Sequence, residues 1–293
     1  MNLNEFTFRV CENLRDSLSI YDIEEIYEKE VVKNNGVIYK GLVLCGKDKE
    51  AAPTIYMEYY YGLCMQGTNM ADITSLIIDN YKDSLRKLDD LEVKANNFED
   101  YKDKLFIKVV NYEKNHVILE DCPFIPFMDL AVTFRYLVHK DENNISSTIV
   151  KNILMDSWGL NTHTLYKIAY ENTKKIFPPM LKKMSEILKL WSPQNIYVPD
   201  NDIYVLTNEC GINGASYITC KEMLEDFCRN KSSEYYIVPS SIHELILVPE
   251  NLEEDAESLK MFIKEVNKSV IDPIDFLSDN LYLYKENAGI KIV

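Results

Sequence analysis

An Asn-Gly turn signal is the feature of this chain that most restricts its fold. Asn35-Gly36 lies between two runs, residues 26–33 and 37–44, that are rich in β-branched and aromatic residues. Asn-Gly pairs favour the positive φ angles of the tight turns that join two antiparallel strands. The sequence therefore predicts a β-hairpin here, and the fold must include an antiparallel sheet.

Other segments have a helical rather than a strand period. Apolar residues recur at spacings of three and four in several stretches, which predicts amphipathic helices over residues 3–18, 73–91, 164–177 and 180–191. Runs of β-branched and aromatic residues predict further strands over residues 105–110 and 130–138. The expected fold class is α+β, with mixed or antiparallel sheets and packed helices.

A polar stretch with two prolines indicates where the chain divides. Pro193 and Pro199 flank this stretch, and a second alternation of strands and helices follows it. With 293 residues, the chain is long enough for two modest cores. We expect two α+β halves, residues 1–195 and an acidic half of residues 196–293.

The excess of acidic over basic residues is the clearest compositional feature. Acidic residues outnumber basic residues by 47 to 32, a formal net charge of −15, which argues against nucleic-acid binding through a basic face. Residues 199–293 hold 18 acidic and 8 basic residues, so most of the excess lies there. Its densest stretch is either a helix start, where the dipole favours acidic groups, or a docking surface for a basic partner. The residues concerned are Glu253, Glu254, Asp255 and Glu257.

One short stretch contains the residue types of a hydrolytic site. Ser241, His243 and Glu244 lie within four positions of one another, whereas catalytic triads come from separated segments, and no Gly-x-Ser-x-Gly elbow is present. The alternative is a tight connection between strands in which these side chains satisfy backbone groups. Arg135, in an apolar strand, needs either an internal ion pair or an anionic ligand.

Two further signals each allow two explanations, and a third argues against a metal site. Tyr56 and Tyr60 either line a ligand groove or pack at the edge of the core. Gly211 and Gly214 precede a predicted helix, where they suit either an anion or close packing. The single, scattered histidines and cysteines lack metal-ligand spacing, so we expect no metal and no cofactor.

The chain has the features of a cytoplasmic protein. Its seven cysteines are scattered and odd in number, which favours a reducing compartment. The N-terminal residues lack the basic start and apolar run of a secretory signal, and no apolar run is long enough to span a membrane. We expect a cytoplasmic location and no membrane association.

Several short motifs resemble those of a known family. They are Asn4-Glu5-Phe6, Pro53-Thr54-Ile55-Tyr56, Leu206-Thr207-Asn208, Gly214-Ala215, the stretch from Pro239 to Glu244, and the stretch from Leu277 to Tyr284. They resemble the clostridial gut-bacterial proteins catalogued as domain of unknown function 5688, over almost the whole chain. A fainter similarity to the YtpQ-like bacterial proteins covers residues 158–173 and Gly214-Ala215. Neither resemblance implies an activity or a catalytic residue.

These observations favour a non-enzymatic protein-interaction module whose partner has a basic surface. Two alternatives stay open. One is a hydrolase-like enzyme whose site combines Arg135 with Ser241, His243 and Glu244 from the other half. The other is an acidic nucleic-acid mimic from a mobile element.

Overall fold

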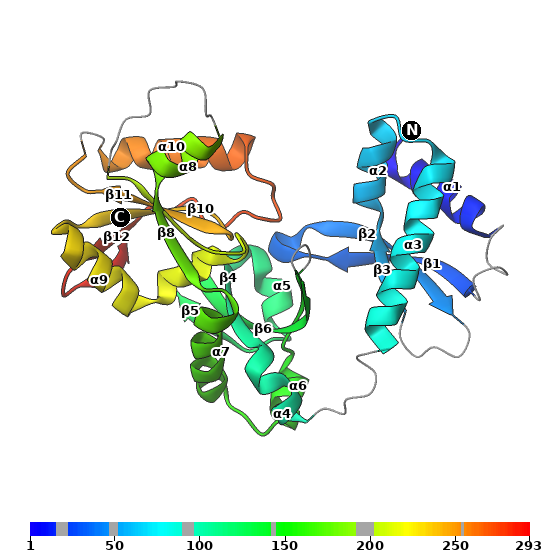
Figure 1. Ribbon diagram of the computed structural model, residues 1–293, viewed down its shortest axis with the longest axis horizontal. Helices are drawn as coiled ribbons and strands as arrows, with labels where there is room; N and C mark the ends of the chain where they lie inside the picture. The colour runs from blue at the N-terminus through cyan, green and yellow to red at the C-terminus, as the bar shows by residue number, and fades with distance from the viewer. Residues whose placement is uncertain (16–22, 47–51, 90–96, 142–144, 192–201, 253–254) are drawn as a thin grey trace. The chain divides into compact units, whose positions relative to one another are not determined.

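The structure is a computed structural model that describes residues 1–15, 23–46, 52–89, 97–141, 145–191, 202–252 and 255–293. These residues form antiparallel sheets and packed helices, which confirms the α+β class (Figure 1). They belong to two compact units. The first unit comprises Met1–Lys33 and Val37–Ala95, and the second comprises Asn34–Gly36 and Asn96–Val293.

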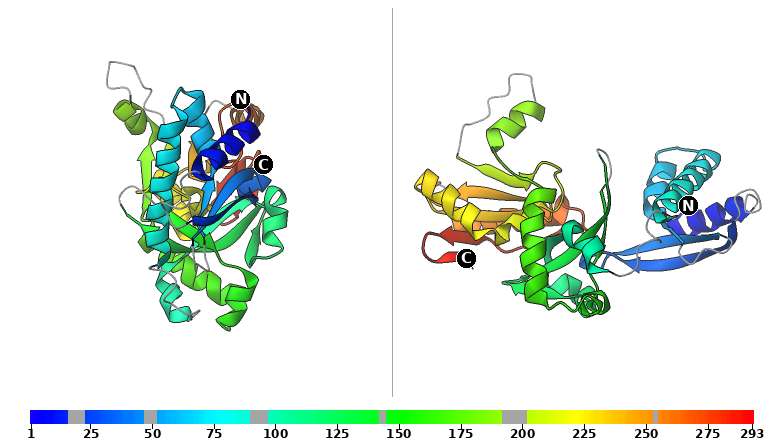
Figure 2. Two further views of the ribbon diagram at one scale, coloured as in Figure 1. Left: turned by 90° about the vertical axis from the view of Figure 1, so that its right-hand side faces the viewer. Right: turned by 60° about the horizontal axis from the view of Figure 1, so that its bottom comes forward.

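The described part of the first unit contains a three-stranded antiparallel sheet with the order β1-β2-β3. Its elements are α1 (Leu3–Arg15), β1 (Ile23–Val32), β2 (Ile38–Gly46), β3 (Thr54–Tyr56), α2 (Met57–Met65) and α3 (Met70–Asp89). The helices cover one face of this sheet (Figure 2). Phe6 and Val10 of α1, together with Ile73 of α3, pack with Leu42 and Leu44 of β2 because alternate strand residues point to the same face.

The predicted hairpin is confirmed. β1 and β2 pair antiparallel, with Val32 opposite Ile38, and the connection runs through Asn34–Gly36. Asn35 has φ 61° and Gly36 has φ 70°, the positive values that the Asn-Gly pair predicts.

The described part of the second unit contains two sheets. One has six strands in the order β13-β12-β10-β11-β9-β8, and in the other β6 pairs with β4, β5 and β7. The strands are β4 (Leu105–Asn111), β5 (Phe124–Phe127), β6 (Leu130–Lys140), β7 (Ile145–Ile149), β8 (Pro179–Lys183), β9 (Tyr204–Asn208), β10 (Tyr235–Ser241), β11 (Glu244–Pro249), β12 (Tyr282–Lys285) and β13 (Gly289–Ile292). The helices are α4 (Phe98–Tyr101), α5 (His116–Leu119), α6 (Asn152–Ser157), α7 (Thr162–Ile176), α8 (Met184–Trp191), α9 (Lys221–Lys231) and α10 (Ala256–Ser269), with a 3-10 turn, η5 (Gly214–Thr219).

Alternation along the strands gives the six-stranded sheet two apolar faces. Ile237 of β10 faces the largest core, where it packs with Phe227 of α9 and with Val132 of β6. Its neighbour Tyr236 faces the opposite side and packs with Leu259 of α10. The two helices therefore cover opposite faces of the sheet, and the largest core lies between the two sheets.

Within the described residues no strand pairs with the outer edge of β4, and side chains accept hydrogen bonds from its backbone N–H groups. The backbone N–H of Ile107 donates to Thr173 Oγ1 of α7 at 3.0 Å, and that of Val109 donates to Ser216 Oγ of η5 at 3.2 Å. Because unpaired strand edges invite association, these bonds close β4 against further pairing along this stretch.

Asn35 is held within the second unit by its side chain as well as its backbone. Its amide nitrogen donates to the carbonyl oxygens of Pro273 at 2.8 Å and Phe276 at 2.7 Å, and its amide oxygen accepts from Asn115 Nδ2 at 2.9 Å. Asn115 Oδ1 also accepts from the Asn35 backbone N–H at 2.9 Å. Asparagine thus supplies both the left-handed backbone and these contacts.

The structure differs from the sequence prediction around residue 180. Residues 179–183 form β8 in place of the first turn of a helix, because they pair with β9 from Pro179 opposite Asn208 to Lys183 opposite Tyr204. The helix begins only at Met184. The expected domain boundary, between residues 195 and 196, lies outside the described residues, as do residues 16–18 of the first predicted helix. Strands β8 and β9, on either side of that boundary, belong to one sheet and to one compact unit.

We expect Asn35→Gly to lower the free energy of unfolding of the second unit by about 2 kcal/mol, because glycine keeps the backbone conformation but loses the side-chain hydrogen bonds. Asn287→Gly is the matched control, since Asn287 has φ 64° and an exposed side chain. Urea unfolding followed by tryptophan fluorescence measures the effect, because both tryptophans, Trp158 and Trp191, lie in this unit. Equal losses for the two variants would contradict the assignment.

Candidate functional site

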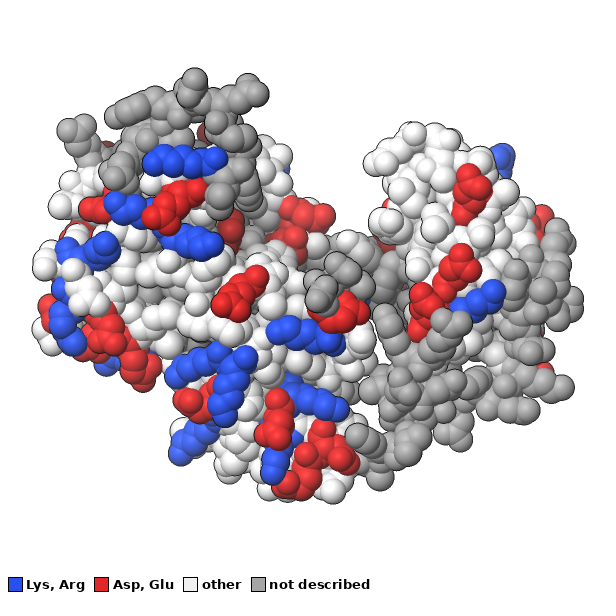
Figure 3. Space-filling view, viewed as in Figure 1, with Lys and Arg blue, Asp and Glu red and all other residues white. Residues whose placement is uncertain are grey.

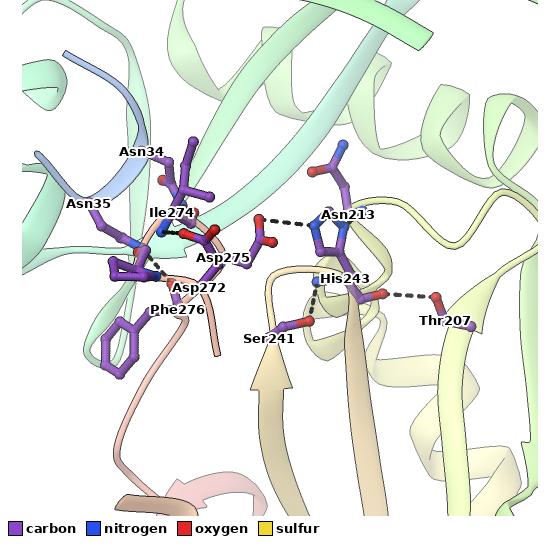
Figure 4. Close-up of polar contacts among 11 residues, drawn as sticks. Asn34, Asn35, Thr207, Asn213, Ser241, His243, Asp272, Ile274, Asp275 and Phe276 are labelled. Carbon is purple, nitrogen blue, oxygen red and sulfur yellow. Dashed lines mark hydrogen bonds and ion pairs between the residues drawn. The ribbon is translucent and has the colours of Figure 1, made fainter. Parts of the chain in front are cut away.

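The stretch with the hydrolytic residue types is the connection between β10 and β11 (Figure 4). Ser241 pairs with Glu244, which leaves Ile242 and His243 at the turn. The His243 backbone N–H donates to Ser241 Oγ at 3.0 Å, and the Ile242 N–H donates to the Asp275 carbonyl oxygen at 2.8 Å. The Ser241 side chain therefore satisfies a backbone group at a tight connection.

Both nitrogens of the His243 ring have partners. Nδ1 accepts from the Asn213 backbone N–H at 3.3 Å, so the neutral ring carries its proton on Nε2, which donates to Asp275 Oδ1 at 3.1 Å. Neither nitrogen is directed to the Ser241 hydroxyl. Glu244 instead accepts from Ser240 Oγ at 3.3 Å. This arrangement does not form the serine-to-histidine hydrogen bond that activates a serine nucleophile.

Arg135 lies on β6 and is held by β7. Its Nε donates to Ser147 Oγ at 3.0 Å, and its Nη2 donates to the Ser147 carbonyl oxygen at 2.7 Å. Burial lowers the pKa of Arg135. Within the described ranges, no carboxylate lies at ion-pair distance from its guanidinium. The internal ion pair expected from the sequence is therefore absent from this part of the chain, and the anionic-ligand alternative stays open.

Lys108 is a second cation on the same sheet, and the sequence reasoning missed it. β4 pairs with β6 so that Phe106 lies opposite Arg135 and Lys108 lies opposite Thr133. Burial and the Arg135 guanidinium lower the pKa of Lys108 to about 7, while the more weakly acting Asp275 carboxylate raises it. A single lysine among the apolar residues of 105–110 was the available signal. Only the strand register places it beside Arg135.

Gly214 is required by close packing. A β-carbon at this position would overlap the His243 carbonyl oxygen and Thr207. The Thr207 hydroxyl donates to that same carbonyl at 2.8 Å, and Ala215 N–H donates to the Ile242 carbonyl oxygen at 3.3 Å. These contacts support the packing explanation for the glycine, and η5 has only six residues.

The two tyrosine candidates have different environments. Tyr60 is buried in the core of the first unit, where its hydroxyl accepts from Asn80 Nδ2. Tyr56 is half-buried at the end of β3, with the Lys33 ammonium 3.5 Å from its ring centroid and the Tyr39 ring at its edge. Tyr60 therefore packs as a core residue, whereas Tyr56 remains partly accessible.

The acidic candidates that the structure describes stabilise the start of α10. Asp255 accepts a hydrogen bond from the Ser258 backbone N–H at 2.7 Å, and this bond lowers the pKa of the Asp255 carboxyl. Glu257 pairs with Lys260 at 2.7 Å. Glu253 and Glu254 lie outside the described residues. On the face drawn in Figure 3, acidic and basic side chains are interspersed over short distances.

β1 presents a second acidic surface, in the first unit. It is a ten-residue edge strand, paired with β2 along one side, and within the described residues no strand pairs with its other side. Its sequence holds Glu24, Glu25, Glu28 and Glu30 against one lysine, Lys29, and all of these residues are exposed. Glu28 pairs with Lys40 of β2 at 2.9 Å. The other three glutamates have no ion pair among the described residues.

No group of three histidine, cysteine, aspartate or glutamate side chains in the described ranges comes close enough together to hold a metal ion. No helix in that part of the chain has the length and apolar character needed to cross a membrane.

Comparison with known proteins gives a family but no relative of known activity. A family model described as "Family of unknown function (DUF5688)" matches residues 3–286, which confirms the resemblance read from the sequence motifs. No curated protein and no solved structure matches the chain. The similarity to YtpQ-like proteins stays a prediction.

We expect Gly214→Ala to lower the free energy of unfolding of the second unit by about 3 kcal/mol, because the added methyl group overlaps backbone atoms that cannot move independently. Gly211→Ala tests a neighbouring glycine with open space around it and φ 65°, so only backbone strain of about 1 kcal/mol is expected there. Urea unfolding of both variants gives the comparison. A larger loss for Gly211→Ala would refute the packing role of Gly214.

Lys108→Met is expected to stabilise the protein more at pH 6 than at pH 10. Below pH 7 the lysine is charged in both the folded and the unfolded chain, and folding buries that charge. Between pH 7 and the unfolded pKa of about 10.4, only the unfolded chain keeps the proton, so wild-type stability rises with pH. Urea unfolding at both pH values measures the difference, with the exposed Lys104→Met as the control for losing a charge. A pH-independent difference would contradict the burial of the Lys108 charge.

Proposed function

The chain belongs to the family of unknown function DUF5688, and we propose that it acts as a protein-interaction module that binds a basic, extended segment of another protein along β1. The observation that carries this proposal is the long exposed edge of β1. An edge strand offers a row of backbone donors and acceptors that a second extended chain can pair with.

The charge of β1 selects the partner. Four glutamates and one lysine give the strand a net negative charge, so a lysine- or arginine-bearing segment gains opposite-charge pairs across the new ladder. A second copy of β1 would instead place glutamates opposite glutamates, which disfavours self-association. The same charges thus protect the edge and discriminate between partners.

The acidic residues at the start of α10 support the proposal less than those of β1 do. Asp255 and Glu257 already have local partners, so part of the C-terminal acidity stabilises a helix. The nucleic-acid mimic rests on charge alone, and the hydrolase-like site rests on side chains whose hydrogen bonds go elsewhere. We propose the cytoplasm as the location, because the seven free cysteines suit a reducing compartment.

A short peptide of alternating lysine and threonine is expected to bind the full chain and to slow hydrogen exchange in β1 amides, because new backbone hydrogen bonds form on its open edge. Glu24→Lys and Glu30→Lys should each weaken binding about fivefold, since each replaces an attraction with a repulsion worth about 1 kcal/mol in total. Hydrogen-exchange mass spectrometry and a peptide titration at two salt concentrations measure these effects.

Asp79→Lys is the matched control, because Asp79 is an exposed acidic residue of α3 in the same unit and the charge change is identical. It should leave binding within twofold of wild type. Protection outside β1, or an equal loss in the control variant, would show that net charge rather than the strand edge recruits the peptide.

A further inference from the structure

Two cations lie next to each other on one face of the four-stranded sheet in the second unit. Leu105, Ile107 and Val109 of β4 point into the largest core, so Lys108 projects from the opposite face. Arg135 of β6 projects from that same face, because its neighbour Phe134 is also in the core. Lys108 pairs with Thr133, two positions from Arg135, which makes the two cations diagonal cross-strand neighbours.

These cations lack the counter-charge that partly buried basic groups normally have. Among the described residues, the Lys108 ammonium makes no hydrogen bond and no ion pair. Arg135 uses Nε and Nη2 on Ser147, which fixes the guanidinium and leaves Nη1 without a partner in the same part of the chain. Bringing two like charges together in a partly buried place is unfavourable, and an anion that joins them relieves the repulsion.

The carboxylate that acts on Lys108 does not fill this role. Asp275 acts on Lys108 electrostatically, but its carboxylate pairs with His243, with Oδ1 at 3.1 Å from Nε2. The Thr133 hydroxyl donates to the Lys108 carbonyl oxygen at 2.8 Å, so it is also engaged. Among the described residues, Lys108 and Arg135 therefore both keep free donors on this face.

We propose that Lys108 and Arg135 form a binding site for a small oxyanion, the carboxylate or phosphate group of a metabolite. One oxygen would accept from the Lys108 ammonium and another from Nη1 of the oriented Arg135 guanidinium. The site lies in the second unit, and its existence does not depend on the β1 interaction. Because an anion favours the charged form of a neighbouring lysine, binding also raises the pKa of Lys108.

Titration of the full chain with inorganic phosphate and, separately, with acetate tests the proposal. The Nζ and Cε resonances of Lys108 in isotope-labelled protein give the readout. Saturable movement of these resonances with either anion supports the site. The anion that binds more tightly shows whether the site prefers a phosphate or a carboxylate group. No saturable movement with either anion in the folded wild type overturns it.

Variants then assign the donors. Lys108→Met and Arg135→Met should each weaken binding at least tenfold for the anion that moves the Lys108 resonances. Lys104→Met, which removes an exposed lysine, should not weaken it. The thermal shift of each variant at increasing anion concentration measures the binding. Arg135→Lys keeps the charge without the planar donors and should give an intermediate affinity.

Asp275→Asn provides a readout that a purely structural role of the two cations would not produce. Asparagine can still accept from His243 Nε2, but the neighbouring negative charge is gone, so the anion should bind several-fold more tightly. Unchanged or weaker binding in this folded variant would contradict an anion held beside Asp275.

Discussion

The apolar core between the two sheets of the second unit is the constraint on which the other features of that unit depend. Ile107 and Val132 from one sheet pack there with Ile237 and Leu245 from the other. Because strand side chains alternate, burying these residues forces the intervening Lys108 to the opposite face. The hydrophobic effect thus fixes the position of the charged group, and the cost of its burial follows from that position.

A second constraint is the close approach of η5 to the β10–β11 connection. Gly214 allows the His243 carbonyl oxygen to lie against Thr207, and Asn213, in a left-handed conformation with φ 57°, directs its N–H to the His243 ring. Asp275 holds the other ring nitrogen. The residues that suggested hydrolysis therefore belong to a network that joins three segments, and its members are satisfied locally.

Sequence patterns were informative where one local rule decided the structure. The Asn-Gly hairpin, α3 and strands β4 and β6 lie where turn chemistry and periodicity place them. Patterns failed for residues 180–183, whose apolar and lysine residues fit a helix, because pairing with β9 decided their conformation. The short strands β5, β7 and β13 were not predicted, since four or five residues carry too little periodicity.

The sequence by itself determined the α+β class, the antiparallel hairpin and the family, because these depend on local pattern and on motifs that persist along the chain. It also singled out Arg135 as a cation in need of a partner. Only the tertiary structure decided that Lys108 is its neighbour, that His243 pairs with Asp275, and that β1 is an open edge. Strand register and order bring distant residues together, and neither is encoded in the spacing of any one segment.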